Sequence, residues 1–430
     1  MILENGLGRC EVTIMRTLIR PPVLNTGHGR TASRLELFFD LAYVLVIAEL
    51  ATAFSNDLTW HGAAVFAGAF TAIWFSWVGF TLYANRFDTD DVIFRVIKLA
   101  AMGAIVGCAA SASDVTGSLS VQFAASYLTA EVLLLILHIR AWINVPEARG
   151  TVGVYALSIS ATCVLWAASL ALDGPARYAM WAVAVAIDAL TPIAVTLRGD
   201  PAPLHLGHLP DRFGLLVILV LGEGIAATVT AAHDSTWAPA TVSTAAIGFV
   251  LFAAMWWNYF DAGASAGQEN LQTVERVAEG TQGETQGNSP DTPTAAEEDV
   301  VSTRRDWYIY GHLPLTLGTA LAAVGLEDLA LHPTAVAGPA ALILTVGLGL
   351  FFVGLVGVVA STAGSLHSAW PWPMLGVVAA TGVVAIPGTG QVAVLTAAVC
   401  TLGLAAAGTA AYRNHQLTVA QGQIPTHTQQ

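Results

Sequence analysis

Carboxylates inside apolar segments are the residues of this sequence best suited to chemistry. The segment RLELFFDLAYVLVIAEL contains three of them, Glu36, Asp40 and Glu49. At about 100° per residue, Glu36, Asp40 and Tyr43 share one stripe of a helix, and Glu49 points to another side. Neighbouring carboxylates repel unless a cation pairs with them or one keeps its proton. The stripe is therefore either a site for substrate or protons or an ion-pair network at the helix start, with Arg34 as the nearest cation in the sequence.

Other ionisable side chains fall deep in later apolar segments. Glu223 in HLPDRFGLLVILVLGEGIAATV lies about 16 Å along a helix from Arg212, near mid-bilayer, with glycines on both sides. Glycines permit close helix approach or local unwinding, and transporters place substrate sites at broken helices of this depth. His312 in YIYGHLPLTLG could relay protons or be only hydrogen bonded. Glu131 and Asp188, also mid-span, are equally compatible with a hydrogen bond between helices and with a site. The candidates for substrate or proton binding are Glu36, Asp40, Tyr43, Arg212, Glu223 and His312.

The loop ANRFDTDDVIFR contains three acids, Asp88, Asp90 and Asp91, and admits three interpretations. Structurally, they cap and start the next helix, favoured by its dipole. Alternatively, they bind a divalent cation such as Mg²⁺. Finally, DTDD fits the DxDD pattern of class II terpene cyclases, in which an aspartic acid protonates an alkene. The first is favoured, and no metal or other cofactor is otherwise expected.

Lys98 is the only lysine and lies near the start of its apolar segment, so a retinal Schiff base of the usual deep kind has no candidate. The sequence also contains no phosphate-binding Gly-rich loop with its lysine, no HExxH and no GxSxG. These common catalytic sites are therefore not expected.

Composition shows which elements must position these residues. The chain has 430 residues, of which 55% are hydrophobic and 11% charged, and its mean hydropathy is +0.63. A soluble domain is about a quarter charged. Apolar runs of roughly 20 residues recur along the chain, each long enough for a membrane-spanning helix. We therefore predict an all-α, polytopic membrane bundle of about twelve helices. The predicted spans are 35–55, 61–83, 92–111, 120–139, 151–172, 178–197, 213–232, 239–260, 307–330, 338–360, 373–388 and 391–411.

Arginines determine the expected orientation, since cytoplasmic loops retain them. With both termini in the cytoplasm, every arginine except Arg177 falls on the cytoplasmic side. The expected parts are a basic leader at 1–34, a first six-helix half at 35–197, a second at 213–411 and a cytoplasmic tail at 412–430. A disordered acidic loop at 261–306 interrupts the second half. A parallel repeat of the two halves rests on a weak match, since the second span ends in NRFD and the eighth in NYFD.

Four stretches resemble motifs of the bacterial low temperature requirement protein A (LtrA) family. They are RLELFFDLAYVLVIAEL, WVGFTLYANRFDTDDVIFR, HLPDRFGLLVILVLGEGI and YGHLPLTLGTALAAVGLEDLALHP, in the family's order. The resemblance implies a multi-pass protein of the bacterial inner membrane without an agreed biochemical activity. The matching positions are Glu36, Asp40, Arg86, Asp88, Asp90, Asp91, Arg212, Glu223, His312 and Glu327.

Two functions are compatible with these observations. The first is a carrier or permease for a small solute or ion, coupled to protons through the intramembrane carboxylates. The alternative is a membrane-embedded enzyme acting on a lipid or isoprenoid at the cytoplasmic face, with the DTDD loop as acid or metal site. The carrier is favoured over an enzyme. The expected partners are the lipid bilayer and an unidentified small molecule or ion, and no nucleic acid.

Overall fold

The chain folds into membrane-length helices. The computed structural model describes residues 19–25, 33–88, 90–198, 204, 209–264, 295–363, 371–385 and 388–422. Within these ranges the chain forms twelve α-helices and two strands of two residues each. Eleven of the helices are long and apolar enough to cross a membrane. The predicted all-α polytopic fold is therefore confirmed.

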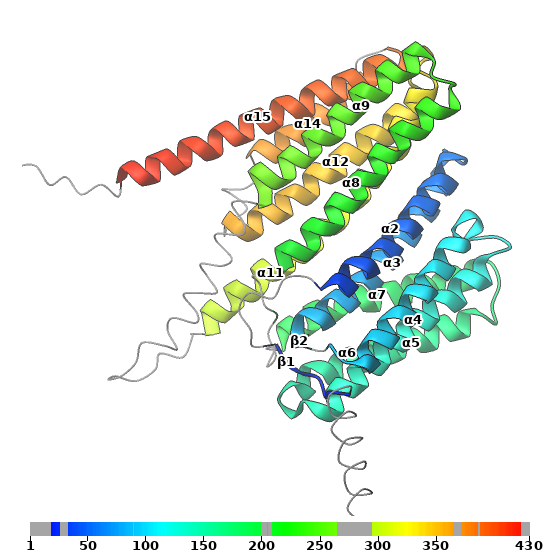
Figure 1. The fold of residues 1–430 in the computed structure, drawn as a ribbon, viewed down its shortest axis with the longest axis vertical. Helices are drawn as coiled ribbons and strands as arrows, with labels where there is room; N and C mark the ends of the chain where they lie inside the picture. The colour runs from blue at the N-terminus through cyan, green and yellow to red at the C-terminus, as the bar shows by residue number, and fades with distance from the viewer. Residues whose placement is uncertain are drawn as a thin grey trace, which may run out of the picture. The chain divides into compact units, whose positions relative to one another are not determined.

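The chain divides into two compact units, Met1–Arg212 and Phe213–Gln430. The helices of unit 1 are α2 (Arg34–Ser55), α3 (Trp60–Arg86), α4 (Val92–Ala110), α5 (Ser120–Asn144), α6 (Arg149–Ser169) and α7 (Pro175–Leu197) (Figure 1). Strands β1 (Val23–Leu24) and β2 (Phe87–Asp88) pair antiparallel, with Val23 opposite Asp88. Within the unit, α4 packs on α5, α5 on α6, α6 on α7 and α7 on α3.

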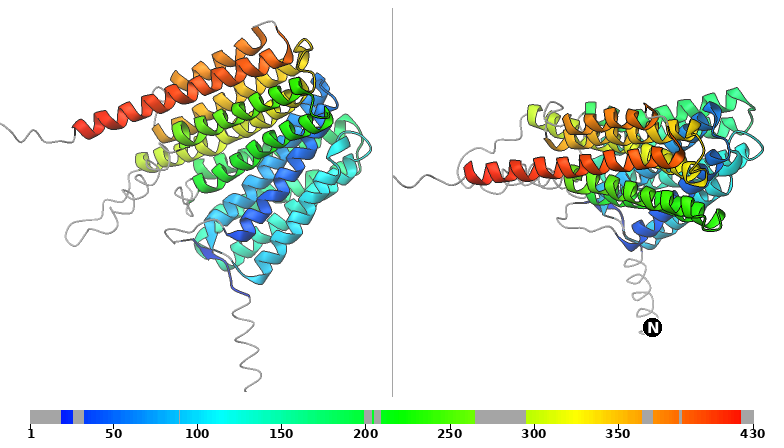
Figure 2. Two further views of the ribbon diagram at one scale, coloured as in Figure 1. Left: turned by 45° about the horizontal axis from the view of Figure 1, so that its top comes forward. Right: turned by 90° about the horizontal axis from the view of Figure 1, so that it is seen from above.

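Helix α8 (Leu209–Asp234) begins at the boundary and leads into unit 2. The other helices of unit 2 are α9 (Pro239–Trp257), the π-helical η4 (Asn258–Ala264), α11 (Ala295–Leu331), α12 (Gly338–Ala363), α14 (Pro371–Ala385) and α15 (Gly390–Gly422). In this unit α11 packs on α12, α12 on α14, α14 on α15 and α15 on α9. The long axes of these helices run side by side in both views of Figure 2.

The predicted spans fall on these helices, but the predicted tail and loop are partly helical. Helix α15 continues to Gly422, so residues 412–422 of the predicted tail extend it, and η4 covers residues 261–264 at the start of the predicted acidic loop. Helix α11 starts at Ala295, so the segment 295–306 continues the helix instead of ending the predicted acidic loop. Residues 265–294 of that loop lie outside the described residues, as do most of the leader and residues 423–430 of the tail. The loop's proposed disorder therefore stays a prediction.

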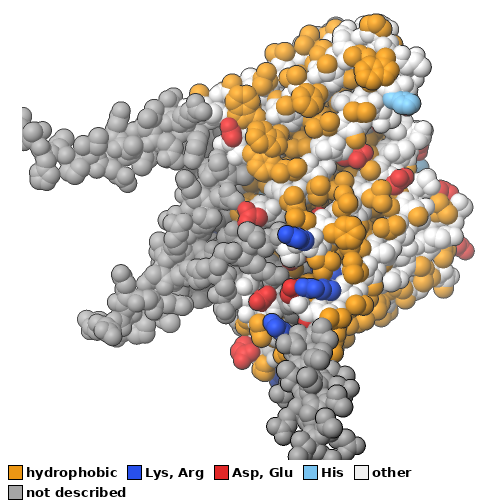
Figure 3. All heavy atoms as spheres, in the orientation of Figure 1, with side chains coloured by type: hydrophobic (Ala, Val, Ile, Leu, Met, Phe, Trp, Pro, Cys, Tyr) orange, Lys and Arg blue, Asp and Glu red, His pale blue; other side chains and the backbone are white. Residues whose placement is uncertain are grey.

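Local sequence signals account for four of the six helix starts in unit 1, and α5 and α6 have no side-chain cap. Ser33 caps α2 in a capping box, Thr59 caps α3 and Asp91 caps α4, each by accepting a backbone hydrogen bond. Gly174 precedes α7 with φ of +56°, a conformation that favours glycine, and Pro175 opens the helix. Hydrophobic side chains dominate the helix faces visible in Figure 3, as expected for surfaces in contact with lipid.

Candidate functional site

Asp40 is the centre of a buried polar network in unit 1. Its side chain is fully buried in α2. Oδ1 accepts a hydrogen bond of 2.8 Å from Trp77 Nε1 on α3 and one of 3.0 Å from Arg212 Nη2. Oδ2 is buried and has no hydrogen-bond partner. Asp40 therefore has its cation, but one of its oxygens is unsatisfied.

Glu36, one turn earlier on α2, has two roles. Its Oε2 accepts a hydrogen bond of 2.8 Å from the Ser33 backbone and completes the capping box. The same oxygen lies 3.5 Å from Arg212 Nη1. Arg212 thus bridges the two acids of the stripe, whereas Arg34, the nearest cation in the sequence, is exposed. The predicted ion-pair network exists, and its cation comes from a residue far along the chain.

Lys98 adds a second buried cation. Its side chain is fully buried in α4, and Nζ has no hydrogen-bond partner. Nζ lies 3.5 Å from the centroid of the Phe39 ring, 5.1 Å from that of Phe80 and 6.0 Å from that of Phe94. Ring faces attract an ammonium group electrostatically. Aromatic rings therefore supply the contacts that a carboxylate or water would make elsewhere.

Two residues of the first segment lie outside this network. The hydroxyl of Tyr43 lies 3.1 Å from Ser76 Oγ on α3, so its hydrogen bond is to neither Glu36 nor Asp40. Glu49 is exposed, as its angle on the helix predicts. Tyr43 therefore points to the interior, as its place on the helix stripe predicts, but its hydrogen-bond partner lies outside the Asp40 network.

The network therefore contains two acids and two bases away from bulk water. Lys98 interacts electrostatically with Glu36, Asp40 and Arg212. Buried charges are costly unless paired and hydrogen bonded, and breaking such a pair costs about 3 to 5 kcal/mol. Three atoms of the network lack hydrogen bonds: the acceptor Asp40 Oδ2 and the donors Lys98 Nζ and Arg212 Nη1, the last of which has only its 3.5 Å ion-pair contact with Glu36. This arrangement can bind a proton, an ion or a small polar group that satisfies one of these atoms.

The acids of the DTDD loop are engaged by arginines. Asp91 caps α4 and accepts hydrogen bonds of 2.9 and 2.6 Å from Arg140 on α5. Asp90 accepts two hydrogen bonds of 2.9 Å from Arg95, and both side chains are exposed. Asp88 lies in β2. Among the described residues, no group of three or more acidic, histidine or cysteine side chains could hold a metal ion.

Unit 2 contains the remaining candidates, Glu223 and His312. His312 is fully buried, with Nδ1 2.6 Å from the Tyr308 carbonyl oxygen and Nε2 2.8 Å from the Tyr259 hydroxyl. Since a carbonyl only accepts, Nδ1 carries hydrogen and Nε2 of the neutral ring accepts from Tyr259. Phe213 packs on the ring at 4.7 Å between centroids. His312 is thus part of an aromatic, hydrogen-bonded cluster.

Glu223 is partly buried on α8 and interacts electrostatically with Glu327 of α11. Helix α8 continues through this position, so the glycines do not unwind it. A Cβ at Gly224 would approach the Phe252 ring to 2.3 Å, which shows that this glycine permits close approach of α9. The sequence left two alternatives for these glycines, close helix approach and local unwinding, and the structure shows close helix approach.

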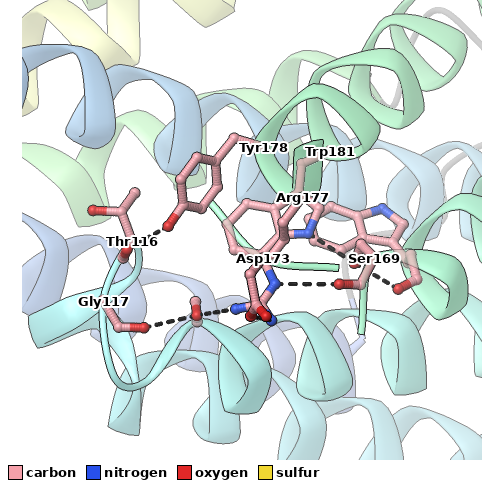
Figure 4. A network of polar contacts seen from close by, with 9 residues as sticks. Thr116, Gly117, Ser169, Asp173, Arg177, Tyr178 and Trp181 are labelled. Carbon is pink, nitrogen blue, oxygen red and sulfur yellow. Dashed lines mark hydrogen bonds and ion pairs between the residues drawn. The ribbon is translucent and has the colours of Figure 1, made fainter. Parts of the chain in front are cut away.

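Arg177, the one arginine expected on the outer side, is buried in a structural network. Its guanidinium donates to the Ser169 carbonyl at 3.2 Å, to the Ser120 hydroxyl and to Asp173 at 3.1 Å (Figure 4). Trp181 donates to the Ser169 hydroxyl at 2.9 Å. The network joins the ends of α5, α6 and α7. Its packing role accounts for an arginine on this side.

Sequence reasoning missed Lys98 and Trp77 as parts of the Asp40 network. Lys98 carried a signal, because a single lysine within an apolar run is unexpected unless the bundle buries it. Trp77 carried none, since tryptophans in apolar segments usually mark interfaces or packing. Arg212 was a candidate, but its pairing with Asp40 was not predicted.

The helices long enough for a bilayer, with ionisable groups turned to the interior, define this chain as a multi-pass membrane protein. Residues 31–407 match the family described as bacterial low temperature requirement A protein (LtrA), and the chain belongs to this family. It is similar to the uncharacterized protein RA0937 of Rhizobium meliloti (strain 1021), with 26% identity over 311 residues covering 70% of each chain. No solved structure matches the chain.

Proposed function

We propose that this LtrA-family protein is a carrier for a small solute or ion, coupled to protons through the Asp40 network. The observation that supports it is a pair of buried, oppositely charged groups with unused hydrogen-bonding atoms, Lys98 Nζ and Asp40 Oδ2. A network kept only for packing is expected to satisfy such atoms, because each one left unmet costs about 1 to 3 kcal/mol. A ligand that satisfies them would recover this free energy.

The position of the network also supports a carrier. Asp40 lies six residues into α2, so it is about 9 Å from the helix start. Intramembrane ionisable groups at such depth mark ion pathways and proton relays in many membrane proteins. The carrier would expose the network to each side in turn, with the ligand stabilising the state that binds it more tightly.

Transport by purified protein in proteoliposomes tests the proposal. A pH-sensitive dye inside the vesicles reports proton movement while gradients of potassium, sodium, ammonium, chloride and phosphate are imposed one at a time. We expect at least one gradient to drive proton flux in wild-type vesicles. Replacing Asp40 by Asn should reduce that flux roughly tenfold or more, because a hydrogen bond to a charged group contributes about 1.5 to 3 kcal/mol.

Glu49→Gln is the matched control, since it removes an exposed acid from the same helix. This variant should transport like the wild type. Size-exclusion chromatography and thermal unfolding establish that both variants are folded. Normal flux through folded Asp40→Asn protein would exclude the Asp40 network as the transport site.

A further inference from the structure

A second pair of acids, Glu131 on α5 and Asp188 on α7, lies in unit 1 apart from the Asp40 network. Glu131 is about 16 Å from the start of α5, and Asp188 is about 20 Å from the start of α7. Both positions are close to the middle of a hydrocarbon core about 30 Å thick. At this depth no lipid headgroup can solvate them.

The two side chains interact with one another. Glu131 is 2% exposed and lies beside the Thr162 hydroxyl of α6, which donates to the Ile159 carbonyl oxygen at 3.0 Å. Asp188 Oδ2 is buried without a hydrogen-bond partner. The carboxyl groups of Glu131 and Asp188 lie close enough for electrostatic interaction. Three neighbouring elements thus bring together two acids and one hydroxyl.

The groups that face this pair do not neutralise it. Tyr127, on the same helix as Glu131, and Cys163 on α6 interact with both acids, and Tyr43 on α2 interacts with Glu131. No lysine, arginine or histidine of the described residues forms an ion pair with Glu131 or Asp188. Tyrosine and cysteine do not supply the positive charge that two carboxylates would need.

We propose that Glu131 and Asp188 form a proton-binding pair that holds a shared proton within unit 1. Two carboxylates close together in a desolvated site repel strongly when both are ionised. One proton bound by the pair removes this repulsion. Protons leave and enter such a pair as a unit, not as two independent groups.

The backbone beside Asp188 adds an acceptor. Pro192 lies inside α7, four residues after Asp188. Proline has no N–H, so it cannot donate the helical hydrogen bond to the Asp188 carbonyl, and helices kink at such positions. The carboxyl of Asp188 is therefore carried one turn before a break in the helical hydrogen bonding of α7.

Tyr43 connects this pair to the proposed transport site. It interacts electrostatically with both Glu131 and Asp40, and its hydroxyl is hydrogen bonded to Ser76. If the proposed function holds, on which this step rests, the pair stores the coupling proton and Tyr43 with Ser76 lies between the pair and Asp40. Binding of the proton itself does not depend on that function.

Infrared spectroscopy of purified protein tests proton binding directly. A protonated carboxyl has a C=O stretching band that shifts in D₂O, whereas a carboxylate lacks it. We expect this band at neutral pH in wild-type protein and its loss in the double variant Glu131→Gln/Asp188→Asn. Each single variant should alter the band as well, because the two groups share the proton.

Glu49→Gln is again the control and should leave the band unchanged. Should the double variant fail to fold, each single variant and a pH titration of the wild type give the same information. An unchanged band in folded double variant would overturn the proposal. Sodium-dependent thermal stabilisation of the wild type that the double variant lacks would also overturn it, since the oxygens would then hold a metal cation.

Transport measurements separate this inference from the proposed function. If the double variant loses the band but keeps wild-type proton-coupled flux, the pair binds a proton outside the transport cycle. That result overturns only the role of the pair in coupling. A wild type with the band but without flux under any gradient contradicts the carrier and leaves the proton-binding pair in place. Loss of both the band and the proton-coupled flux in the double variant supports the complete proposal.

Discussion

Lys98 is a residue of unit 1 whose burial is energetically unfavourable. Its ammonium group has aromatic contacts but no hydrogen bond and no ion pair within 4.0 Å among the described residues. Burying an ionisable group without a paired partner is unfavourable, because the group loses its water and no carboxylate compensates for it. A group retained at such a cost is expected to act in function.

The variant Lys98→Met tests this expectation. We predict that its thermal unfolding temperature in detergent equals or exceeds that of the wild type, because methionine fills the same volume without a desolvation cost. Proton flux in proteoliposomes should fall roughly tenfold or more, as expected when about 1.5 to 3 kcal/mol of charge-assisted binding is lost. Function and stability should therefore change in opposite directions.

Arg95→Met is the control, since it removes an exposed cation from the same helix. This variant should match the wild type in both measurements. A marked fall in the unfolding temperature of Lys98→Met, with or without loss of flux, would instead show that Lys98 stabilises the acids of the network.

At the residue scale the sequence predicted the acids but not their partners. Helical periodicity placed Glu36 and Asp40 on one stripe, which follows from local geometry alone. The cation of Asp40 is Arg212, separated from it by 172 positions along the chain. Such a pairing depends on how helices pack, and one sequence does not contain that information.

At the scale of elements, the closest packing in unit 2 is between α11 and α12. Glycines at 311, 318 and 325 on α11 repeat every seven residues, as do Ala340, Gly347 and Gly354 on α12. A Cβ at Gly347 would lie 2.6 Å from the Ala322 nitrogen and 2.7 Å from the Gly318 oxygen. These helices therefore meet backbone to backbone, as small residues allow in membranes.

A pair of alanine substitutions on α12 measures this contact. Gly347→Ala should lower the free energy of unfolding by about 1 to 3 kcal/mol, because an added methyl group must displace backbone atoms. Gly349→Ala, two residues away with no atom within 4 Å of its Cβ, should be neutral or stabilising. Chemical unfolding in detergent compares them. Equal stability of both variants would show that α11 and α12 are farther apart.

Hydropathy predicted the elements well because each membrane-spanning helix needs its own apolar run. The predicted spans therefore lie on helices with ends within a few residues in most cases. The early start of α11 was missed because residues 295–306 are polar, and a helix that leaves the apolar layer has no hydropathy signal. The seven-residue spacing of the glycines was present in the sequence, but only the structure shows that the two rows face one another.

At the scale of the whole molecule, the two units repeat one local design. In each, the third helix carries a nitrogen base four residues after an aromatic residue, Lys98 after Phe94 and His312 after Tyr308. Each base packs on a phenylalanine of the first helix of its series, Phe39 of α2 or Phe213 of α8.

The helices also pack in the same order in the two units. This order favours a parallel duplication in which the two sites have diverged. The NRFD and NYFD motifs do not add to it, since NRFD ends in strand β2 and NYFD lies in η4. A charged base with two acids lies in one unit, and a histidine with tyrosines lies in the other.

The number of membrane crossings depends on α14, which has only 15 residues. The segments that precede α12 and α15 lie together, since Gly390 N donates to Ala335 O at 3.0 Å and Val336 pairs with Thr389. Helix α12 leaves this end of unit 2, and α15 starts from it. The chain therefore returns through α14, and we predict twelve crossings for the described helices, one more than the eleven of full membrane length.

An even number of crossings predicts that both termini are on the same side of the membrane. Because the arginines favour the cytoplasm for that side, an epitope after residue 430 should bind antibody only in permeabilised cells. In a variant without the natural cysteines, Thr236→Cys marks the expected outer side and Glu147→Cys the cytoplasmic side, and both positions are exposed. A membrane-impermeant maleimide should label intact cells at position 236 and not at 147. Antibody binding to intact cells would mean that α14 does not cross, and the chain would then have an odd number of spans.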